Sequence, residues 1–387
     1  MPLLFVLAAG CLVSAMTMRI VDPVVPAIAR DLAISPDAVA LLASAFTFPY
    51  AFSQPLLGSL GDALGKARII KVSLLAVLVC LVVAALAPGI EVLLVARIVG
   101  GAAAGGIIPL AFALIGDRIA FAERQIALSR LLSAVIAGQL TGSIGSGLLA
   151  SYFGWRASMM VGAVLASLAL LLVAVQLRPR INADRPQFTL AGMRAGYRQV
   201  FANPSALVCF TAVFIEGIVI FGLFPYVAIL LESRGAGGLR EAGFVLAGFG
   251  IGGFVYVAIV KLLLPRIGFM NLIRAGGLVT GLGFAALSLG GSWPAETAAF
   301  FVIGVGFYMI HNSLQTLATE LAPGNRGAAV AAHAFFFFLG QAAGPIVYGQ
   351  SLALAGSTVT LLLAAAVMAL LGYGTARGLI ARGQALD

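Results

Sequence analysis

Long apolar runs, separated by short polar stretches, fill almost the whole chain. A helix needs about 20 residues to cross roughly 30 Å of hydrocarbon, and twelve runs are long enough to be candidates. Inside lipid only helices and closed barrels satisfy their backbone hydrogen bonds, and these runs are continuous rather than alternating, which indicates helices. The predicted spans cover residues 3–28, 38–60, 69–88, 92–115, 126–150, 157–177, 204–231, 241–264, 269–290, 295–318, 327–350 and 354–376.

Composition supports a membrane protein and excludes other classes. Hydrophobic residues make up 61% of the 387 residues and charged residues 10%, against about 25% charged in soluble domains. Mean hydropathy is +1.10. These values exclude a soluble globular enzyme, a disordered chain and a disulfide scaffold. Cys11, Cys80 and Cys209 lie far apart in apolar runs, so we expect inert thiols, no metal site and no cofactor.

The basic residues predict the orientation of the spans. The net charge is +9, which we attribute to the bilayer rather than to nucleic acid. With the N-terminus in the cytoplasm, 17 of the 23 Lys and Arg residues flank cytoplasmic ends and 4 flank the opposite side. This asymmetry predicts that both termini are cytoplasmic, in the plasma (cell inner) membrane. No basic stretch precedes the first span, so we expect no cleaved signal peptide.

One polar stretch divides six spans from six. We therefore predict an N-terminal six-helix bundle over 1–177, a cytoplasmic linker over 178–203 and a C-terminal six-helix bundle over 204–387. The linker carries several arginines with apolar residues between them, namely Phe188, Leu190, Met193, Tyr197 and Phe201. Either an amphipathic helix on the inner membrane face or a plain charged linker fits this pattern.

The two halves also share residues at a fixed offset. An offset of 202 pairs Pro23 with Pro225, Arg124 with Arg326, Gly138 with Gly340, Gln139 with Gln341, and Gly142 with Gly344. An offset of 203 pairs Gly65 with Gly268 and Lys71 with Arg274. Parallel six-helix repeats joined by a cytoplasmic linker are a known transporter architecture.

The segment GSLGDALGKAR, between the second and third spans, closely resembles a loop of the major facilitator superfamily. Gly65 allows a tight turn there, and the acid stands at a helix end near two basic residues. The resemblance implies a conformational latch formed by Gly58, Asp62, Gly65, Lys66 and Arg68. The second-half copy, KLLLPRIGFMN, lacks the acid.

Further segments resemble the same superfamily and its drug:proton antiporter branch. RIVGGAAAGG, which begins at Arg97, resembles the fourth-span pattern, and GQLTGSIGSG resembles the fifth-span motif with Ser143 at the expected proline. RIVDPVVPAIARDL and FGWR also look like that branch. The resemblance implies an all-α fold of twelve transmembrane helices, arranged as two six-helix pseudo-repeats around a central cavity. It also implies helix-packing hinges at Gly138, Gly142, Gly340, Gly344 and Pro345.

Few ionisable residues lie inside the predicted spans, and such residues are functional candidates because lipid makes them costly. Asp22 on span one and Arg97 on span four each lie about 9 Å from a span end, at 1.5 Å per residue. The superfamily fold brings these spans together, so we expect an Asp22–Arg97 ion pair with Arg19 one turn deeper than Asp22. The pair either neutralises buried charge or exchanges partners during transport.

Glu216 lies near the middle of span seven with no cation on an adjacent turn. Burial of a lone carboxyl favours its protonated form, so Glu216 and Asp22 are our proton-coupling candidates; a counter-charge for a cationic substrate is the alternative. His333 is expected to be structural. The candidates for the wall of the substrate cavity are Arg19, Asp22, Arg97, Glu216, His311, Asn312 and Gln315. The polar face formed by His311, Asn312 and Gln315 on span ten could instead serve ordinary interhelical hydrogen bonding.

The sequence lacks an ATP-binding GxxxxGK[ST] loop and an HExxH metal motif. We therefore predict a non-enzymatic secondary transporter, driven by protons or by another cation such as sodium. The favoured function is proton-coupled efflux of a small amphipathic compound by alternating access. Transport of a small organic anion, held by Arg19 and Arg97, is an alternative, and a non-transporting sensor or scaffold is another. The expected partners are a small-molecule substrate, protons and the lipid bilayer, without nucleic acid, and we expect a monomer.

Overall fold

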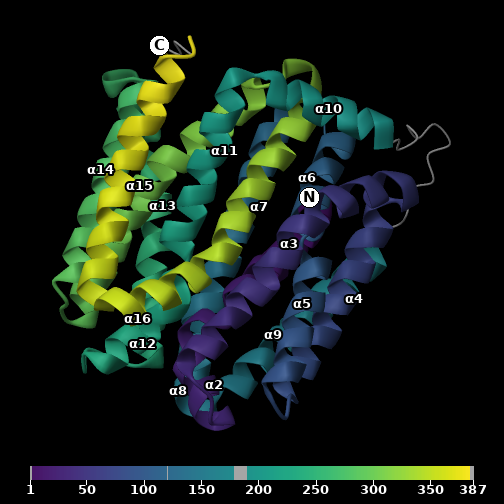
Figure 1. Ribbon diagram of the computed structural model, residues 1–387. Coiled ribbons are helices and arrows are strands. Elements are labelled where there is room, and N and C mark those ends of the chain that lie inside the picture. Colours follow the sequence, from purple (N-terminus) through teal and green to yellow (C-terminus); the bar gives the residue numbers. More distant parts are fainter. Residues whose placement is uncertain (1, 120, 178–189, 384–387) are drawn as a thin grey trace. The chain divides into compact units, whose positions relative to one another are not determined.

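The computed structural model describes residues 2–119, 121–177 and 190–383, which are helical with short turns and contain no strand (Figure 1). Ten helical segments in this part of the chain are long and apolar enough to cross a membrane. The predicted all-α membrane fold is confirmed. The chain divides into two compact units, Met1–Phe188 and Thr189–Asp387, which are described separately.

The first unit contains six spans, several of them interrupted. The spans are built from α1 (Pro2–Arg19), η1 (Asp22–Val24) and α2 (Val25–Leu32); α3 (Pro36–Leu64); α4 (Lys66–Ala85); α5 (Ile90–Ala104) and α6 (Ile107–Arg118); α7 (Phe121–Leu140), η2 (Thr141–Gly145) and α8 (Ser146–Phe153); and α9 (Trp155–Gln176). Span one breaks where Pro23 and Pro26 follow α1, because proline has no N–H to donate and clashes with the preceding turn.

The second unit follows the same plan. Its elements are α10 (Leu190–Ala202), α11 (Pro204–Glu216), η3 (Gly217–Phe221), η4 (Phe224–Tyr226), α12 (Val227–Ser233), α13 (Leu239–Ile267), α14 (Phe269–Ser288), α15 (Trp293–Glu320), η5 (Pro323–Asn325) and α16 (Arg326–Ile380). The long α16 consists of two helices that meet at Gly356, where the backbone is not helical. Counting α16 as two spans and including α3, the described residues form twelve.

Turns recur at the offset found in the sequence. Gly154 has φ 80° and ψ 161°, and Gly356, 202 positions later, has φ 74° and ψ 172°. Gly65 and Gly268 likewise both have positive φ, 101° and 77°. A side chain would strain the backbone in this region, which glycine adopts freely. The tight turn predicted at Gly65 is therefore confirmed, and it has a counterpart in the second unit.

The glycines shared by the two halves bring helices into close contact. A Cβ added to Gly138 would collide with the carbonyl oxygen of Leu12, and one added to Gly340 would collide with that of Phe214. Leu12 and Phe214 are themselves 202 residues apart. The same correspondence links Gly142, next to Met16, with Gly344, next to Ile218: an added Cβ would lie 2.5 Å and 2.8 Å from those two carbonyl oxygens. Spans one and five thus pack in the same way as spans seven and eleven, while the hinge role of these positions stays a prediction.

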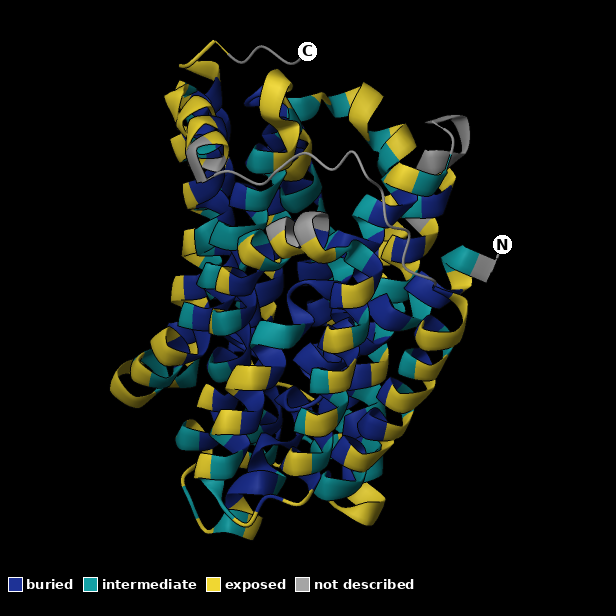
Figure 2. Cartoon of the chain, turned by 90° about the vertical axis from the view of Figure 1, so that its right-hand side faces the viewer, coloured by how far each residue is buried: buried dark blue, intermediate teal, exposed yellow. Residues whose placement is uncertain are grey.

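Exposed positions recur along the helices (Figure 2), and many of them carry large apolar side chains. Leu171 and Val175 of α9 are 60% and 67% exposed, and Leu207 of α11 and Leu370 of α16 are both 69% exposed. A soluble protein rarely leaves so much apolar surface in water. These faces are suited to contact with lipid.

Residues 190–202 of the predicted linker form the helix α10, which packs on other helices of the second unit. The ring of Phe201 lies 5.5 Å from that of Phe210 and 6.3 Å from that of Phe336, and Gln199 accepts a hydrogen bond from Asn325. Burial raises the pKa of Tyr197. A helix rather than a plain linker is therefore confirmed for this part; its place on the membrane face stays a prediction. Phe188 lies outside the described residues, and the side chains of Leu190 and Met193 are not described.

Replacing Gly340 by Ala should destabilise the second unit, because the new methyl group meets the Phe214 carbonyl directly. Overpacking of this kind costs about 1–3 kcal/mol of unfolding free energy. Thermal unfolding in detergent measures the effect. Gly116→Ala is the matched control, since a Cβ there meets nothing within 4 Å. Equal stability of the two variants would contradict the packing described.

Candidate functional site

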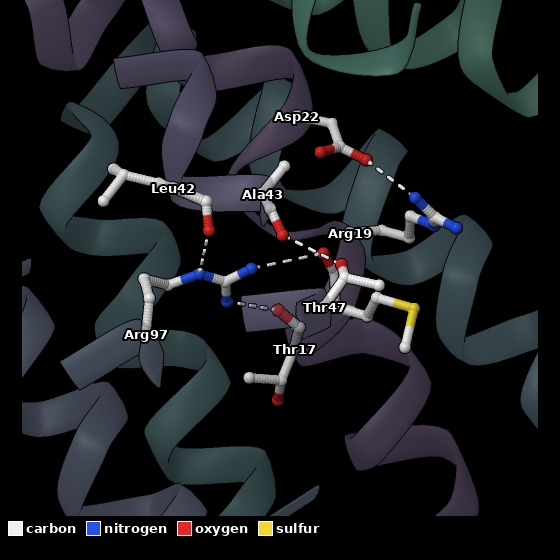
Figure 3. Close-up of polar contacts among 8 residues, drawn as sticks. Thr17, Arg19, Asp22, Leu42, Ala43, Thr47 and Arg97 are labelled. Atoms are coloured by element: carbon white, nitrogen blue, oxygen red, sulfur yellow. Dashed lines mark hydrogen bonds and ion pairs between the residues drawn. The ribbon is translucent and has the colours of Figure 1, made fainter. Parts of the chain in front are cut away.

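Asp22 and Arg19 form a buried ion pair at the break in span one (Figure 3). Arg19 Nη1 lies 3.5 Å from Asp22 Oδ2, and the side chains are 5% and 0% exposed. Neither carboxylate oxygen of Asp22 accepts a hydrogen bond from a described residue. The carboxylate is therefore held mainly by charge, which makes it sensitive to a change in its own protonation.

Arg97, on α5, binds the backbone rather than a carboxylate. Its Nε donates to the carbonyl of Leu42 at 3.2 Å, Nη1 to that of Thr17 at 2.8 Å and Nη2 to that of Met18 at 3.4 Å (Figure 3). The guanidinium also lies 4.1 Å from the ring centroid of Phe46, which favours a cation. Thr17 and Met18 stand in the last turn of α1, where carbonyls lack intrahelical partners.

The expected Asp22–Arg97 ion pair is therefore wrong: the carboxylate pairs with Arg19, and the guanidinium satisfies carbonyls. The physical reason is the break after α1, which leaves carbonyl oxygens without intrahelical partners among buried residues. Each of these carbonyls requires a donor, and Arg97 supplies two, while its third donor binds the Leu42 carbonyl of α3. The charges of Asp22 and Arg97 remain within electrostatic range of one another.

The second unit satisfies the equivalent carbonyl with a neutral group. Val219 occupies the position 202 residues after Thr17, and its carbonyl accepts a hydrogen bond of 2.7 Å from the Tyr348 hydroxyl. Nearby, the Tyr226 hydroxyl donates to the carbonyl of Pro345 at 2.9 Å. The repeat therefore uses a buried cation at this position in one unit and tyrosine in the other.

Glu216 is a fully buried acidic residue of the second unit. It ends α11 and precedes the π-helical turn η3, a local widening that is frequent at functional sites. Its side chain is 0% exposed, and Oε2 lies 3.0 Å from Nδ1 of His311 on α15. The carboxyl thus has a titratable partner from span ten, although its own helix offers none.

Aromatic rings enclose this pair. The imidazole of His311 stacks on Phe307 at a centroid distance of 4.8 Å and lies 4.4 Å from Phe337. His333 follows at 5.1 Å and is 2% exposed. Within the described chain, Oε1 of Glu216 and Nε2 of His333 have no hydrogen-bond partner. We name Glu216, His311 and His333 the carboxyl–imidazole cluster.

Sequence reasoning missed His333 as a member of this cluster. A signal was present: the chain has 2 histidines, and both fall in predicted spans. Asn312, next to His311 in the chain, is half-buried and Gln315 is exposed; their place in a cavity wall stays a prediction. Among the described residues no group of three His, Cys, Asp or Glu side chains is placed to hold a metal ion.

At the predicted latch, Lys66 begins α4 and forms an ion pair with Asp117 near the end of α6. The Nζ–Oδ2 distance is 2.7 Å. Arg68 is exposed. The side chain of Asp62 is not among those described, so the latch stays a prediction. Asp117 is a partner of Lys66 that the motif did not reveal.

Comparison with known proteins agrees with this architecture. The family described as Major Facilitator Superfamily matches residues 7–345. The chain is 24% identical over 349 residues to multidrug resistance protein 1 of Bacillus subtilis (strain 168), covering 90% of this chain and 89% of that protein. It is 22% identical over 350 residues to the quinolone resistance protein NorA of Staphylococcus aureus (strain Mu50 / ATCC 700699), covering 89% of each.

Solved structures share the fold. The nucleoside transporter NupG superposes with a TM-score of 0.79 at 15% identity, covering 99% of this chain and 100% of that one. The human organic anion transporter MFSD10 (TETRAN) superposes with a TM-score of 0.72 at 16% identity, covering 97% and 99%. At these identities the likeness concerns the fold and not the substrate.

Arg97→Lys should destabilise the protein, although it conserves the charge. A lysine ammonium cannot reproduce the planar fork that reaches three carbonyls, and a lost hydrogen bond to a charged group costs about 1.5–3 kcal/mol. Thermal unfolding in detergent measures the loss, with the exposed Arg68→Lys as control. Wild-type stability of Arg97→Lys would show that the carbonyl contacts do not hold α1 in place.

Proposed function

The chain belongs to the major facilitator superfamily, and from its buried ionisable clusters we propose that it exports small amphipathic compounds in exchange for protons. It is an integral membrane transporter of small molecules and not an enzyme. Relatives named for multidrug and quinolone resistance support efflux. The observation that carries the proposed proton coupling is the contact between Glu216 and His311.

The carboxyl–imidazole cluster has the chemistry of a proton-binding site. An ionised carboxylate without water is costly unless it is paired or protonated. Glu216 and His311 can share one proton across 3.0 Å, so the pair titrates as a unit. Loss of that proton leaves a net negative charge, which only water or a cationic ligand stabilises in this enclosed site. Protonation therefore biases the transporter toward states in which the site is closed.

Asp22 is the second proton-coupling candidate. Protonation of the Asp22 carboxylate would remove its ion pair with Arg19, whose guanidinium lies 3.5 Å away. The guanidinium of Arg19 would then be available to bind another acceptor. This exchange provides a second place where proton binding changes the balance between conformations. The rocking of one unit against the other, the latch around Gly65 and the packing glycines belong to the same proposed alternating-access cycle.

The organic-anion alternative has weaker support. It requires Arg19 and Arg97 as a carboxylate clamp, yet the nitrogens of Arg97 already donate to three backbone carbonyls. An anion would have to displace them. A non-transporting sensor or scaffold has no support from the relatives, whose names describe resistance to drugs.

Glu216→Gln should abolish accumulation driven by a pH gradient, because the amide cannot exchange a proton with His311. Proteoliposomes with an imposed pH gradient are assayed with a panel of cationic, neutral and anionic amphipathic dyes, and the variant is compared on the dyes that the wild type moves. Glu91→Gln, at an exposed position, is the control. Unfolding free energy should change by no more than about 1 kcal/mol, the usual size of a tolerated substitution.

Normal gradient-driven accumulation by Glu216→Gln would remove Glu216 from the mechanism. A preference of the wild type for anionic dyes would favour the organic-anion alternative. Absence of flux for every dye, in protein that is folded and correctly inserted, would contradict the proposed efflux.

We further propose that both termini are cytoplasmic and that the protein works as a monomer in the plasma (cell inner) membrane. The support for this topology is that 17 of the 23 basic residues lie on one predicted side.

A membrane-impermeant maleimide should label Arg30→Cys in intact cells and Arg68→Cys only after lysis, since both positions are exposed and lie on opposite predicted sides. The reverse labelling pattern would invert the topology.

A further inference from the structure

The second unit has an apolar groove between α11 and the C-terminal part of α16. Its volume is about 500 Å³, within the range of about 300–1,000 Å³ that small-molecule sites occupy. Leu207 and Ile215 line it from α11, and Val367 and Leu370 from α16. We call it the α11–α16 groove; it lies outside the carboxyl–imidazole cluster.

Gly374 keeps the groove open. A Cβ built on this glycine meets nothing within 4 Å, and the residue is exposed. Leu207 and Leu370, both 69% exposed, border the opening. A hydrocarbon chain seated here would cover apolar surface that the protein itself leaves uncovered.

The groove has a direction relative to the membrane. α11 begins at Pro204 and α16 ends at Ile380, so Leu207 and Arg382 mark the same end of the two helices. Ile215 lies about 12 Å deeper than Leu207 at 1.5 Å per residue. The groove therefore runs from the level of the lipid headgroups toward the middle of the bilayer.

Arg382 stands at the headgroup end and lines the groove. Its Nη1 donates to the carbonyl of Gly378 at 2.9 Å, and it forms no ion pair with a described residue. Arg377, also exposed, lies on the same helix end. An arginine fork at this depth is matched to a phosphate, which it can bind through two hydrogen bonds, and basic residues at the membrane surface attract anionic lipids.

We propose that the α11–α16 groove binds one phospholipid with an anionic headgroup, whose acyl chain lies against Leu207, Ile215 and Leu370 and whose phosphate contacts Arg382. Charge complementarity favours this occupant over a second copy of the chain. A second copy carries a net charge of +9 and would be repelled by the basic residues Arg377 and Arg382 at this end of the groove. The site is independent of the transport cycle proposed above; under the proposed topology the lipid belongs to the cytoplasmic leaflet.

Native mass spectrometry of the full, delipidated protein tests the proposal with phosphatidylglycerol and phosphatidylcholine of identical acyl chains. Phosphatidylglycerol should bind about fivefold more tightly, the ratio expected for one basic residue at an anionic headgroup. Arg382→Gln should remove this preference, whereas the neighbouring Arg377→Gln should leave most of it.

Gly374→Leu tests the groove itself. The added side chain enters open space, so thermal stability should be unchanged while binding of both lipids weakens. Gly116→Leu adds the same bulk at another open glycine and should leave lipid binding intact. Equal affinity of the wild type for the two lipids, or an unchanged preference in Arg382→Gln, would overturn the proposal. A dimer that Gly374→Leu dissociates would instead assign the groove to a second copy.

Discussion

The absence of water within the bilayer is the constraint on which this structure depends. Wherever a span breaks, carbonyl groups lose their intrahelical partners, and each needs a donor from a neighbouring helix. Arg97 fills that role for Thr17 and Met18 in the first unit, and Tyr348 fills it for Val219 in the second. The breaks are thus maintained by specific side chains, and they place polar groups deep in an otherwise apolar bundle.

The choice of donor gives the two units different electrostatics. The first unit has buried cations at its break. Asp22 forms an ion pair with Arg19 and also lies within electrostatic range of Arg97. The second unit uses a neutral hydroxyl at the equivalent carbonyl and so adds no cation there. Glu216 then depends on His311, whose own charge is conditional on a proton. The duplicated framework thus places guanidinium groups beside the acid in the first unit and an imidazole beside the acid in the second.

The sequence predicted the fold closely because span length, turn glycines and the repeat offset are encoded locally. Gly65 and Gly268 show this, since the sequence pairs them and both have positive φ. Helix partners were harder to predict. The sequence indicates how far Arg97 lies from the end of its span but not which atoms it contacts. A backbone carbonyl that has lost its intrahelical partner cannot be recognised from the residue types around it. His333 was missed for a related reason: whether spans ten and eleven turn their histidines toward each other depends on tertiary packing.

The central claim is that the buried acid Glu216 holds an exchangeable proton. Infrared spectroscopy of the Glu216 carboxyl group tests this claim most directly. The difference spectrum between wild type and Glu216→Gln isolates its carbonyl stretch, which separates the acid from the carboxylate. The account predicts a protonated-acid band that disappears as pH rises and shifts in His311→Asn. A carboxylate band at every pH, or an acid band that pH and His311 leave unchanged, would contradict it.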